Sequence, residues 1–149
     1  MQRLLTIILS CFVLTACNGD SLTPEQQVRN SLLAMEEAAQ ERSMSKFMNY
    51  VSDDYSDHQG NNKEAIKRLL QVIFLRNQNI NIFTLIRSVE INDGIAAVEL
   101  SAAMASRDVD LKQETNRLKA DTQRFSIVLS SENNNETWLV QSMSWQPGW

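Results

Sequence analysis

The chain has 149 residues and a formal net charge of -4 at pH 7, because 18 acidic residues outnumber 14 lysines and arginines. This length suits one domain with an apolar core, and the acidic balance argues against nucleic acid or an anionic lipid surface as a partner. One histidine, four glycines and two cysteines, both within the first 17 residues, leave little material for a metal centre or a phosphate-binding loop. We therefore expect no metal and no cofactor.

The first 17 residues have the features of a targeting segment. Met1–Arg3 form a short basic start, and Leu4–Leu14 form an apolar run that is shorter than the roughly 20 apolar residues a membrane-spanning helix needs. The run leads into Leu-Thr-Ala-Cys at positions 14–17, which resembles the lipobox of bacterial lipoproteins. The resemblance implies cleavage before Cys17 and attachment of lipid to its thiol. Cys11 would then leave with the signal peptide, so no disulfide could form in the mature chain.

The predicted organisation is a lipoprotein signal peptide at residues 1–16, a lipidated tether at 17–22 and one domain at 23–149. Asn18 follows the cysteine where an aspartate would resemble the inner-membrane retention signal, so the resemblance implies the periplasmic face of the outer membrane of a Gram-negative cell. Two or three acyl chains hold a protein more firmly than one, so it should remain on that membrane. The alternative is an ordinary secreted protein whose cleavage site happens to contain cysteine.

Three helices are predicted in the first half of the domain. The first begins at the capping sequence Thr-Pro-Glu-Gln, residues 23–26, and ends near Arg42. The second is capped by Ser43, and the third follows a cap formed by Asn61 with Glu64. Apolar residues recur at helical spacing in all three: Val28, Leu32, Met35 and Ala39; Met44, Phe47, Met48 and Val51; Ile66, Leu69, Leu70, Ile73 and Phe74.

From Asn79 onward the apolar pattern changes to a period of two, which predicts four strands. Ile80–Ile91 is rich in β-branched residues, and Asn92–Gly94 is a strong hairpin turn. Arg107–Asp121 is polar and is predicted to be a solvated hairpin tip rather than a binding arm, and Glu132–Glu136 is predicted to be a second turn. Alternating apolar residues mark the other strands: Ala96, Val98, Leu100, Ala102 and Met104; Phe125, Ile127 and Leu129; Trp138, Val140, Met143 and Trp145.

Three helices followed by a four-stranded antiparallel meander predict an α+β domain with the helices on one face of the sheet. The order of elements, the turn DDYSDHQG at residues 53–60 and the closing ETWLVQSMSW at 136–145 resemble the nuclear transport factor 2-like superfamily, which includes the SnoaL-like cyclases and the ketosteroid isomerases. The resemblance covers nearly all of residues 23–146. It implies a cone, in which a curved sheet wraps around the helices and a pocket opens at the wide end. It also implies homodimers formed through the outer face of the sheet.

Four residues are candidates for ligand binding. In the enzymes of that superfamily a carboxylate near the pocket acts as a base, and Asp57 is the nearest match, although His58 replaces the usual proline after the base. Tyr55 and Asp57 are predicted to point together toward the cone mouth; the alternative is that Asp54 and Asp57 cap and order the turn. Arg76 is predicted either to meet an anionic ligand or to satisfy carbonyls at the end of its helix.

The set of acids is incomplete for catalysis, because residues 125–129 and 138–143 of the last strands contain none. The expected function is therefore that of an envelope lipoprotein whose cone binds an apolar small molecule or whose sheet binds an envelope protein. The alternative is a pocket enzyme of isomerase, cyclase or hydrolase type that uses Asp57.

Overall fold

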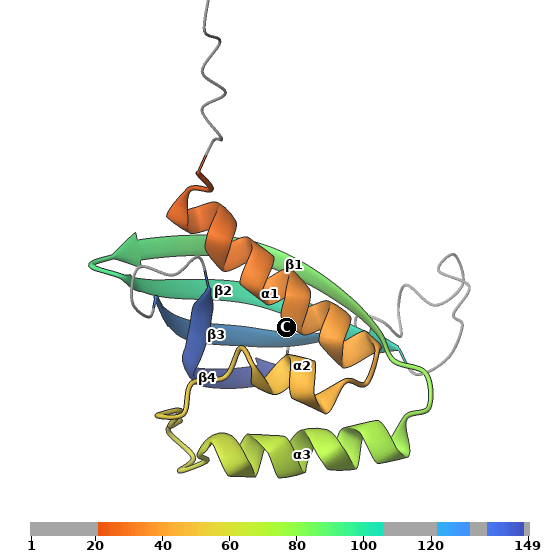
Figure 1. Ribbon diagram of the computed structural model, residues 1–149. Coiled ribbons are helices and arrows are strands. Elements are labelled where there is room, and N and C mark those ends of the chain that lie inside the picture. The colour runs from red at the N-terminus through yellow and green to blue at the C-terminus, as the bar shows by residue number, and fades with distance from the viewer. Residues whose placement is uncertain (1–20, 106–121, 132–136, 148–149) are drawn as a thin grey trace, which may run out of the picture.

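A computed structural model describes residues 21–105, 122–131 and 137–147. In this part of the chain three helices precede an antiparallel sheet with the strand order β1-β2-β3-β4, and Figure 1 shows the helices gathered on one face of the curved sheet. The predicted fold class is confirmed. The predicted signal peptide, Cys17, the segment 107–121 and the turn at 132–136 lie outside the described residues. The elements are α1 (Pro24–Gln40), α2 (Met44–Met48), α3 (Lys63–Arg76), β1 (Asn81–Asn92), β2 (Ile95–Ala105), β3 (Thr122–Ser131) and β4 (Trp138–Pro147).

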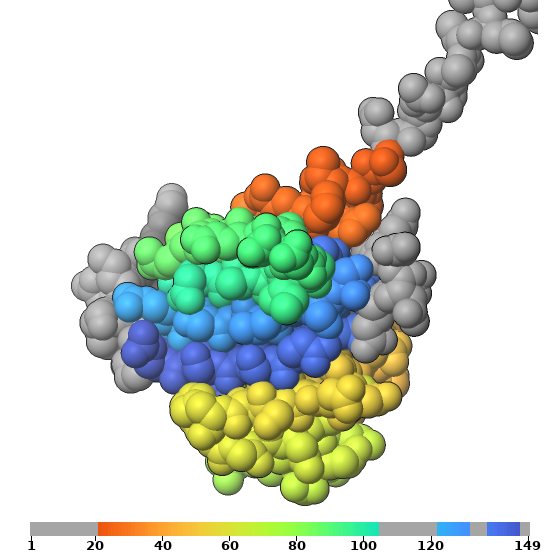
Figure 2. Space-filling view, turned by 90° about the vertical axis from the view of Figure 1, so that its left-hand side faces the viewer, coloured from red at the N-terminus to blue at the C-terminus, as the bar shows by residue number. Residues whose placement is uncertain are grey.

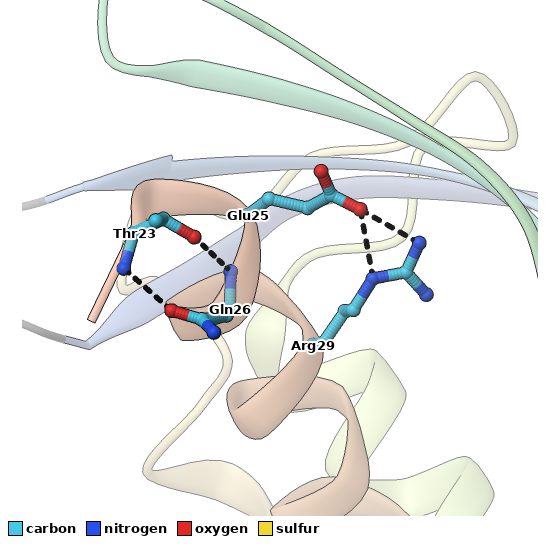
Figure 3. A network of polar contacts seen from close by, with 4 residues as sticks. All are labelled: Thr23, Glu25, Gln26 and Arg29. Carbon is cyan, nitrogen blue, oxygen red and sulfur yellow. Dashed lines mark hydrogen bonds and ion pairs between the residues drawn. The ribbon is translucent and has the colours of Figure 1, made fainter.

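The start of α1 is capped as the sequence predicts. The Thr23 hydroxyl accepts a hydrogen bond from the Gln26 amide at 3.3 Å, and the Gln26 side chain accepts one from the Thr23 amide at 2.8 Å (Figure 3). Pro24 occupies the first helical position, where no amide hydrogen is needed. The Arg29 guanidinium also binds the Glu25 carboxylate at 2.8 Å, but an exposed pair of this kind adds little to the free energy of unfolding. The reciprocal cap is the main local contribution, typically about 1 kcal/mol.

α1 ends in a Schellman motif whose left-handed residue is an arginine. Arg42 has a φ of +57°; its amide donates to the Ala39 carbonyl at 3.0 Å, and the following amide donates to that of Ala38 at 2.8 Å. Glycine is usual at this position, because a side chain costs about 1 kcal/mol in the left-handed region. Here the side chain is used: the guanidinium donates to the carbonyls of Phe74 at 2.8 Å and Gln78 at 3.3 Å. Arg42 thereby ties the end of α1 to the end of α3.

The starts of α2 and α3 differ in detail from the predicted caps. Ser43 occupies the N-cap position of α2, but its side chain makes no capping hydrogen bond. The cap of α3 is Asn62, whose side chain accepts from the Ala65 amide at 3.0 Å, and not Asn61 as predicted. The reason is that the Asn61 side chain is already bonded to Asp57 in the preceding turn.

The first hairpin of the sheet turns at Asp93 and Gly94 as predicted. Both have positive φ, +47° and +76°, which a type I′ turn requires. The register shifts at Arg87 in β1 and at Gln141 in β4, and such bulges bend a sheet locally. The bulge in β4 changes the alternation, so that even-numbered residues before it and odd-numbered residues after it share the inner face: Trp138 and Val140, then Met143 and Trp145.

The core lies between the inner face of the sheet and the helices. Val28, Leu32 and Met35 of α1 pack with Met48 of α2 against inward residues of all four strands. A smaller cluster of Ala39, Phe74 and Ile80 joins the ends of α1 and α3 to the residue that precedes β1. The buried residues of the main cluster on the sheet are Ala96, Val98, Leu100, Ile127, Leu129, Trp138 and Val140.

The segment that follows α2 pairs with the outer edge of β4. The Val140 amide donates to the Tyr50 carbonyl at 2.8 Å, and the Ser52 amide donates to the Val140 carbonyl at 3.0 Å. The Ser56 amide reaches the carbonyl of the bulge residue, Gln141, at 3.0 Å. These bonds hold the turn at residues 53–60 beside the last strand.

Candidate functional site

Three of the predicted site residues lie in the turn at 53–60, which folds around the carboxylate of Asp57. Its Oδ1 accepts hydrogen bonds from the backbone amides of Gln59 and Asn61, each at 2.9 Å. Its Oδ2 accepts from the Asn61 side chain at 2.9 Å and from the Tyr55 hydroxyl at 3.3 Å. Tyr55 is 2% exposed and Asp57 is 8% exposed. The two side chains therefore form a buried pair, and the turn together with the following residue, Asn61, occupies both oxygens of Asp57.

These contacts stabilise the ionised form of Asp57 and the protonated form of Tyr55. Burial acts to raise the pKa of Asp57, but hydrogen bonds from Asn61, Gln59 and Tyr55 outweigh it and hold this pKa below its usual value. Burial, followed by the nearby charge of Asp57, raises the pKa of Tyr55 to about 12. A general base works best when its pKa is near the working pH and its lone pairs can reach substrate. The geometry at Asp57 instead supports the capping role.

His58 and Arg76 do not join this pair. His58 is exposed in the turn, and Arg76 is the last residue of α3, a 14-residue helix that starts just beyond the turn. At 1.5 Å per residue Arg76 lies about 20 Å further along the helix axis. Near the end of α3 the carbonyls of Phe74 and Ile73 are bound by Arg42 and Asn77, and among the described residues no hydrogen bond joins the Arg76 side chain to a helix-end carbonyl. Its side chain is exposed to solvent.

A second candidate site lies on the inner face of the sheet, where burial falls along the strands. At one end, the residues that β2, β3 and β4 contribute to one cross-strand row are at most 1% exposed: Ala96, Leu129 and Val140. Their partner in β1, Ile91, is 37% exposed. Three rows further along, Ala102 lies between Thr84 and Gln123, and all three are partly exposed. Along β2, β3 and β4 the core is therefore closed at the first end and open at the second.

We define the open end of the sheet by five partly exposed inner-face residues: Thr84, Ala102, Gln123, Phe125 and Trp145. Phe125 and Trp145 are cross-strand partners, and Met44 and Phe47 of α2 pack against both core clusters. The Thr84 hydroxyl, the Gln123 side-chain amide and the Trp145 indole N–H are the polar side-chain groups of these five residues. An apolar surface with few polar groups is the usual composition of a small-molecule site.

The sequence pattern did not reveal the open end as a site. Ala102 is part of the predicted apolar alternation of β2, but the shared row of Thr84, Ala102 and Gln123 depends on the register of three strands. The available signal was the change from large apolar residues to small or polar ones at alternate positions: Leu100 to Ala102 in β2, and Phe125 back to Gln123 in β3.

The arrangement of helices and sheet is shared with solved structures from several bacteria. Bd1075 from Bdellovibrio bacteriovorus superposes with a TM-score of 0.66 and 11% identity over 82% of this chain, which spans 40% of the length of Bd1075. A cystatin-like domain of unknown function from Nostoc punctiforme has a TM-score of 0.66 and 12% identity, over 87% of this chain and 80% of its own. A protein from Streptomyces avermitilis is described as a candidate dehydratase of the nuclear transport factor 2-like family. It has a TM-score of 0.62 and 14% identity, over 85% of this chain and 99% of its own.

The chain has the nuclear transport factor 2-like cone fold. Identities of 11–14% show this fold and nothing of the activity. No protein-family model matches the sequence, and no curated protein is significantly similar to it. Within the described part of this cone, no helix is long and apolar enough to cross a membrane. The same residues contain no group of three or more His, Cys, Asp or Glu side chains placed to hold a metal ion.

Proposed function

We propose that the protein is a non-enzymatic module that binds a small apolar or aromatic molecule at the open end of the sheet. In this proposal, lipid on Cys17 holds the module at the periplasmic face of the outer membrane. Binding is favoured over catalysis by one observation: the Asp57 carboxylate is ionised and already hydrogen-bonded by neighbouring residues. Its oxygens accept four hydrogen bonds from Tyr55, Gln59 and Asn61, and its pKa is lowered. A carboxylate in that state is a poor base.

The open end has the chemistry that such a ligand needs. Phe125 and Trp145 offer aromatic surface, and Thr84 and Gln123 offer one or two hydrogen bonds to fix the orientation of the ligand. Binding of this kind requires no base and no group to stabilise a developing anion. The proposed ligand is therefore an apolar or aromatic body that carries few polar groups.

Ala102 is the position at which the proposal is best tested. We would measure the affinity of the full-length chain for the uncharged aromatic probe 1-N-phenylnaphthylamine by fluorescence titration. Ala102→Trp fills the centre of the open end, and we expect it to weaken binding by roughly tenfold or more. Ala97→Trp is the matched control, because Ala97 lies on the same strand but is exposed on the outer face of the sheet.

Two results would overturn the ligand proposal. One is a chain that does not bind the probe at all, and the other is equal affinity in Ala102→Trp and the wild type. Thermal unfolding of both variants should accompany the titration, so that loss of binding is not confused with loss of the fold.

A specific contact favours an enzyme as the second candidate. The Tyr55 hydroxyl lies 3.3 Å from the Asp57 carboxylate in a buried setting, and one of the fold neighbours is described as a candidate dehydratase. A pocket enzyme of isomerase, cyclase or hydrolase type would lose its function in cells with Asp57→Asn while its abundance and membrane location remained normal. The binding module would keep its function in that variant wherever the protein remains folded.

A further inference from the structure

The outward face of α3 is more apolar than a solvent-exposed helix face normally is. Leu69, Val72 and Leu75 are 45%, 42% and 74% exposed, and their three-residue spacing places them along one side of the helix. The opposite side of α3 carries the buried Ile66 and Phe74. Single exposed apolar residues are common on protein surfaces, but three in one stripe are typical of a surface that binds a partner.

Two arginines bracket this stripe. Arg68 precedes it and Arg76 follows it, and both are exposed. Among the described residues neither arginine has an ion pair, whereas Lys63 of the same helix binds Asp53 at 2.7 Å. The helix carries four basic residues and one acidic residue in a chain whose net charge is -4. The surface of α3 around the stripe is therefore locally basic, although the net charge of the protein is negative.

The positions of the arginines argue against a second copy of the same helix as the partner. If two α3 helices packed antiparallel about Val72, Arg68 of each would face Arg76 of the other. If they packed parallel, each arginine would face its own counterpart. Like charges would meet in both orientations, which disfavours the pairing.

The position of α3 in the molecule argues against the anchoring membrane as the partner. Figures 1 and 2 show α3 on the side of the domain away from the start of α1. Five residues between Cys17 and Thr23 span at most about 18 Å, so the proposed lipid anchor would hold the start of α1, rather than α3, close to the bilayer. This step rests on the proposed anchor, whereas the arguments from charge and exposure do not.

We propose that the outward face of α3 docks an acidic amphipathic helix of a partner protein. The complementary helix would present apolar side chains to Leu69, Val72 and Leu75, with two carboxylates eight residues apart that reach Arg68 and Arg76. The apolar stripe would supply most of the affinity, and the two arginines would select the partner by charge.

A variant of the same protein can serve as the binding partner in the test. The double variant Arg68→Glu, Arg76→Glu carries the same apolar stripe between two carboxylates eight residues apart, which is the chemistry the proposal requires. We would mix full-length wild type with this double variant, one of them enlarged by a tag, with Val72→Cys in both. Disulfide-linked heterodimers would be measured by non-reducing electrophoresis. Matched mixtures without Val72→Cys give the amount of cross-linking through the native cysteines, which is subtracted. Residue 72 faces residue 72 in either helix orientation, so the cross-link reports contact at α3 and not at the sheet.

We expect cross-linked heterodimers at least roughly tenfold more abundant than either homodimer, with the excess falling severalfold as salt rises from about 50 to about 200 mM. Leu75→Asp in the wild-type partner should remove the excess, because it breaks the stripe and leaves both arginines. Equal amounts of the heterodimer and the two homodimers would overturn the proposal, and so would an excess of heterodimer that Leu75→Asp leaves unchanged.

A sedimentation assay with phosphatidylglycerol vesicles separates a protein partner from a membrane. Wild type and the double variant share any lipid anchor, so a difference between them reports α3 alone. We expect equal pelleting. Pelleting of the wild type severalfold above the double variant would assign the stripe to an anionic lipid surface and overturn the protein partner. The readouts use neither the open end nor Asp57, so failure here is distinguishable from failure of the proposed ligand site.

Discussion

The indole Nε1 of Trp138 donates a hydrogen bond to Oε1 of Gln27 at 3.1 Å, joining β4 to α1 across 111 positions of the sequence. The backbone amide of the same tryptophan donates to the Ser31 hydroxyl at 3.2 Å, one helical turn further on. Trp138 is 2% exposed, so both of its donors are satisfied by α1 in the absence of bulk water. These two hydrogen bonds hold β4 against α1 at the closed end of the cone, and the open end lies at the other end of the same sheet face.

Gln27→Ala removes the acceptor of the indole and leaves a buried donor unpaired. We expect a loss of about 1–3 kcal/mol in the free energy of unfolding, measured by urea denaturation. Gln40→Ala is the control, because Gln40 is exposed on the same helix and its side chain bonds to Glu36 one turn earlier, so it should change stability by less than about 0.5 kcal/mol. Indistinguishable midpoints for the two variants would show that the link contributes nothing.

Substitutions of Arg42 should lower stability in a defined order: wild type most stable, then the glycine variant, then the alanine variant. If Arg42 served only as a helix cap, the glycine variant would be the most stable. Arg42→Gly removes the hydrogen bonds to α3 but suits the φ of +57°, and we expect a loss of roughly 1–2 kcal/mol. Arg42→Ala loses the same bonds and keeps the left-handed strain, so it should be about 1 kcal/mol less stable than the glycine variant. Denaturant unfolding of all three proteins checks the order, and a glycine variant as stable as the wild type would show that the guanidinium is dispensable.

The Tyr55–Asp57 pair should make stability depend on pH in a defined window. The pKa of Asp57 is lowered in the folded protein, so its stabilising contribution is present above the unfolded pKa of about 3.9 and is lost as pH falls through the lower folded value. The pKa of Tyr55 is raised to about 12, so the contribution of Tyr55 is present below about pH 10 and is lost as pH rises toward 12.

Two variants separate these contributions. Asp57→Asn should be less stable than the wild type at pH 7, and the difference should shrink below about pH 4. Tyr55→Phe should lose about 1 kcal/mol at pH 7 and should remove the alkaline loss of stability that the tyrosine causes. Urea midpoints across the pH range test both expectations, and a difference for Asp57→Asn that is constant from pH 7 to pH 3 would contradict the ionised cap.

Lipid attachment at Cys17 leads to a direct labelling experiment. Cys17→Ser should leave an unprocessed or mislocalised precursor, because the thiol that would carry the lipid is absent. Cells fed labelled fatty acid should label the wild type and Cys11→Ser, the control with the same change inside the predicted signal peptide. Equal incorporation of label into Cys17→Ser would refute the assignment.

The outer face of the sheet is the expected site of self-association. Phe83, Leu85 and Val128 are 47%, 62% and 37% exposed there, and the resemblance to the superfamily implied dimers through this face. Leu85→Glu should lower the sedimentation coefficient of a wild-type dimer to that of a monomer. A wild type that remains monomeric at high concentration would argue against the dimer and would leave the fold unaffected.

The sequence by itself determined the local features of this protein, because they depend on residues within a few positions of one another. Thr23 and Gln26 cap α1 through backbone amides three residues apart, and Asp93 with Gly94 forms a turn that needs only their own φ values. The alternation of Ala96 and Val98 identified the buried face of β2 for the same reason.

Only the tertiary structure decided which residues meet across the chain. Arg42 was predicted only as the approximate end of a helix, yet it binds carbonyls more than 30 positions away, in the place considered for Arg76. The role of Asp57 depended on how the turn closes, since its partner Asn61 was predicted to cap the next helix. The open end depended on strand register, which places Thr84, Ala102 and Gln123 in one row. Which residues meet over a long separation depends on the packing of the whole core, so a local pattern in the sequence indicates a face but not the partners across it.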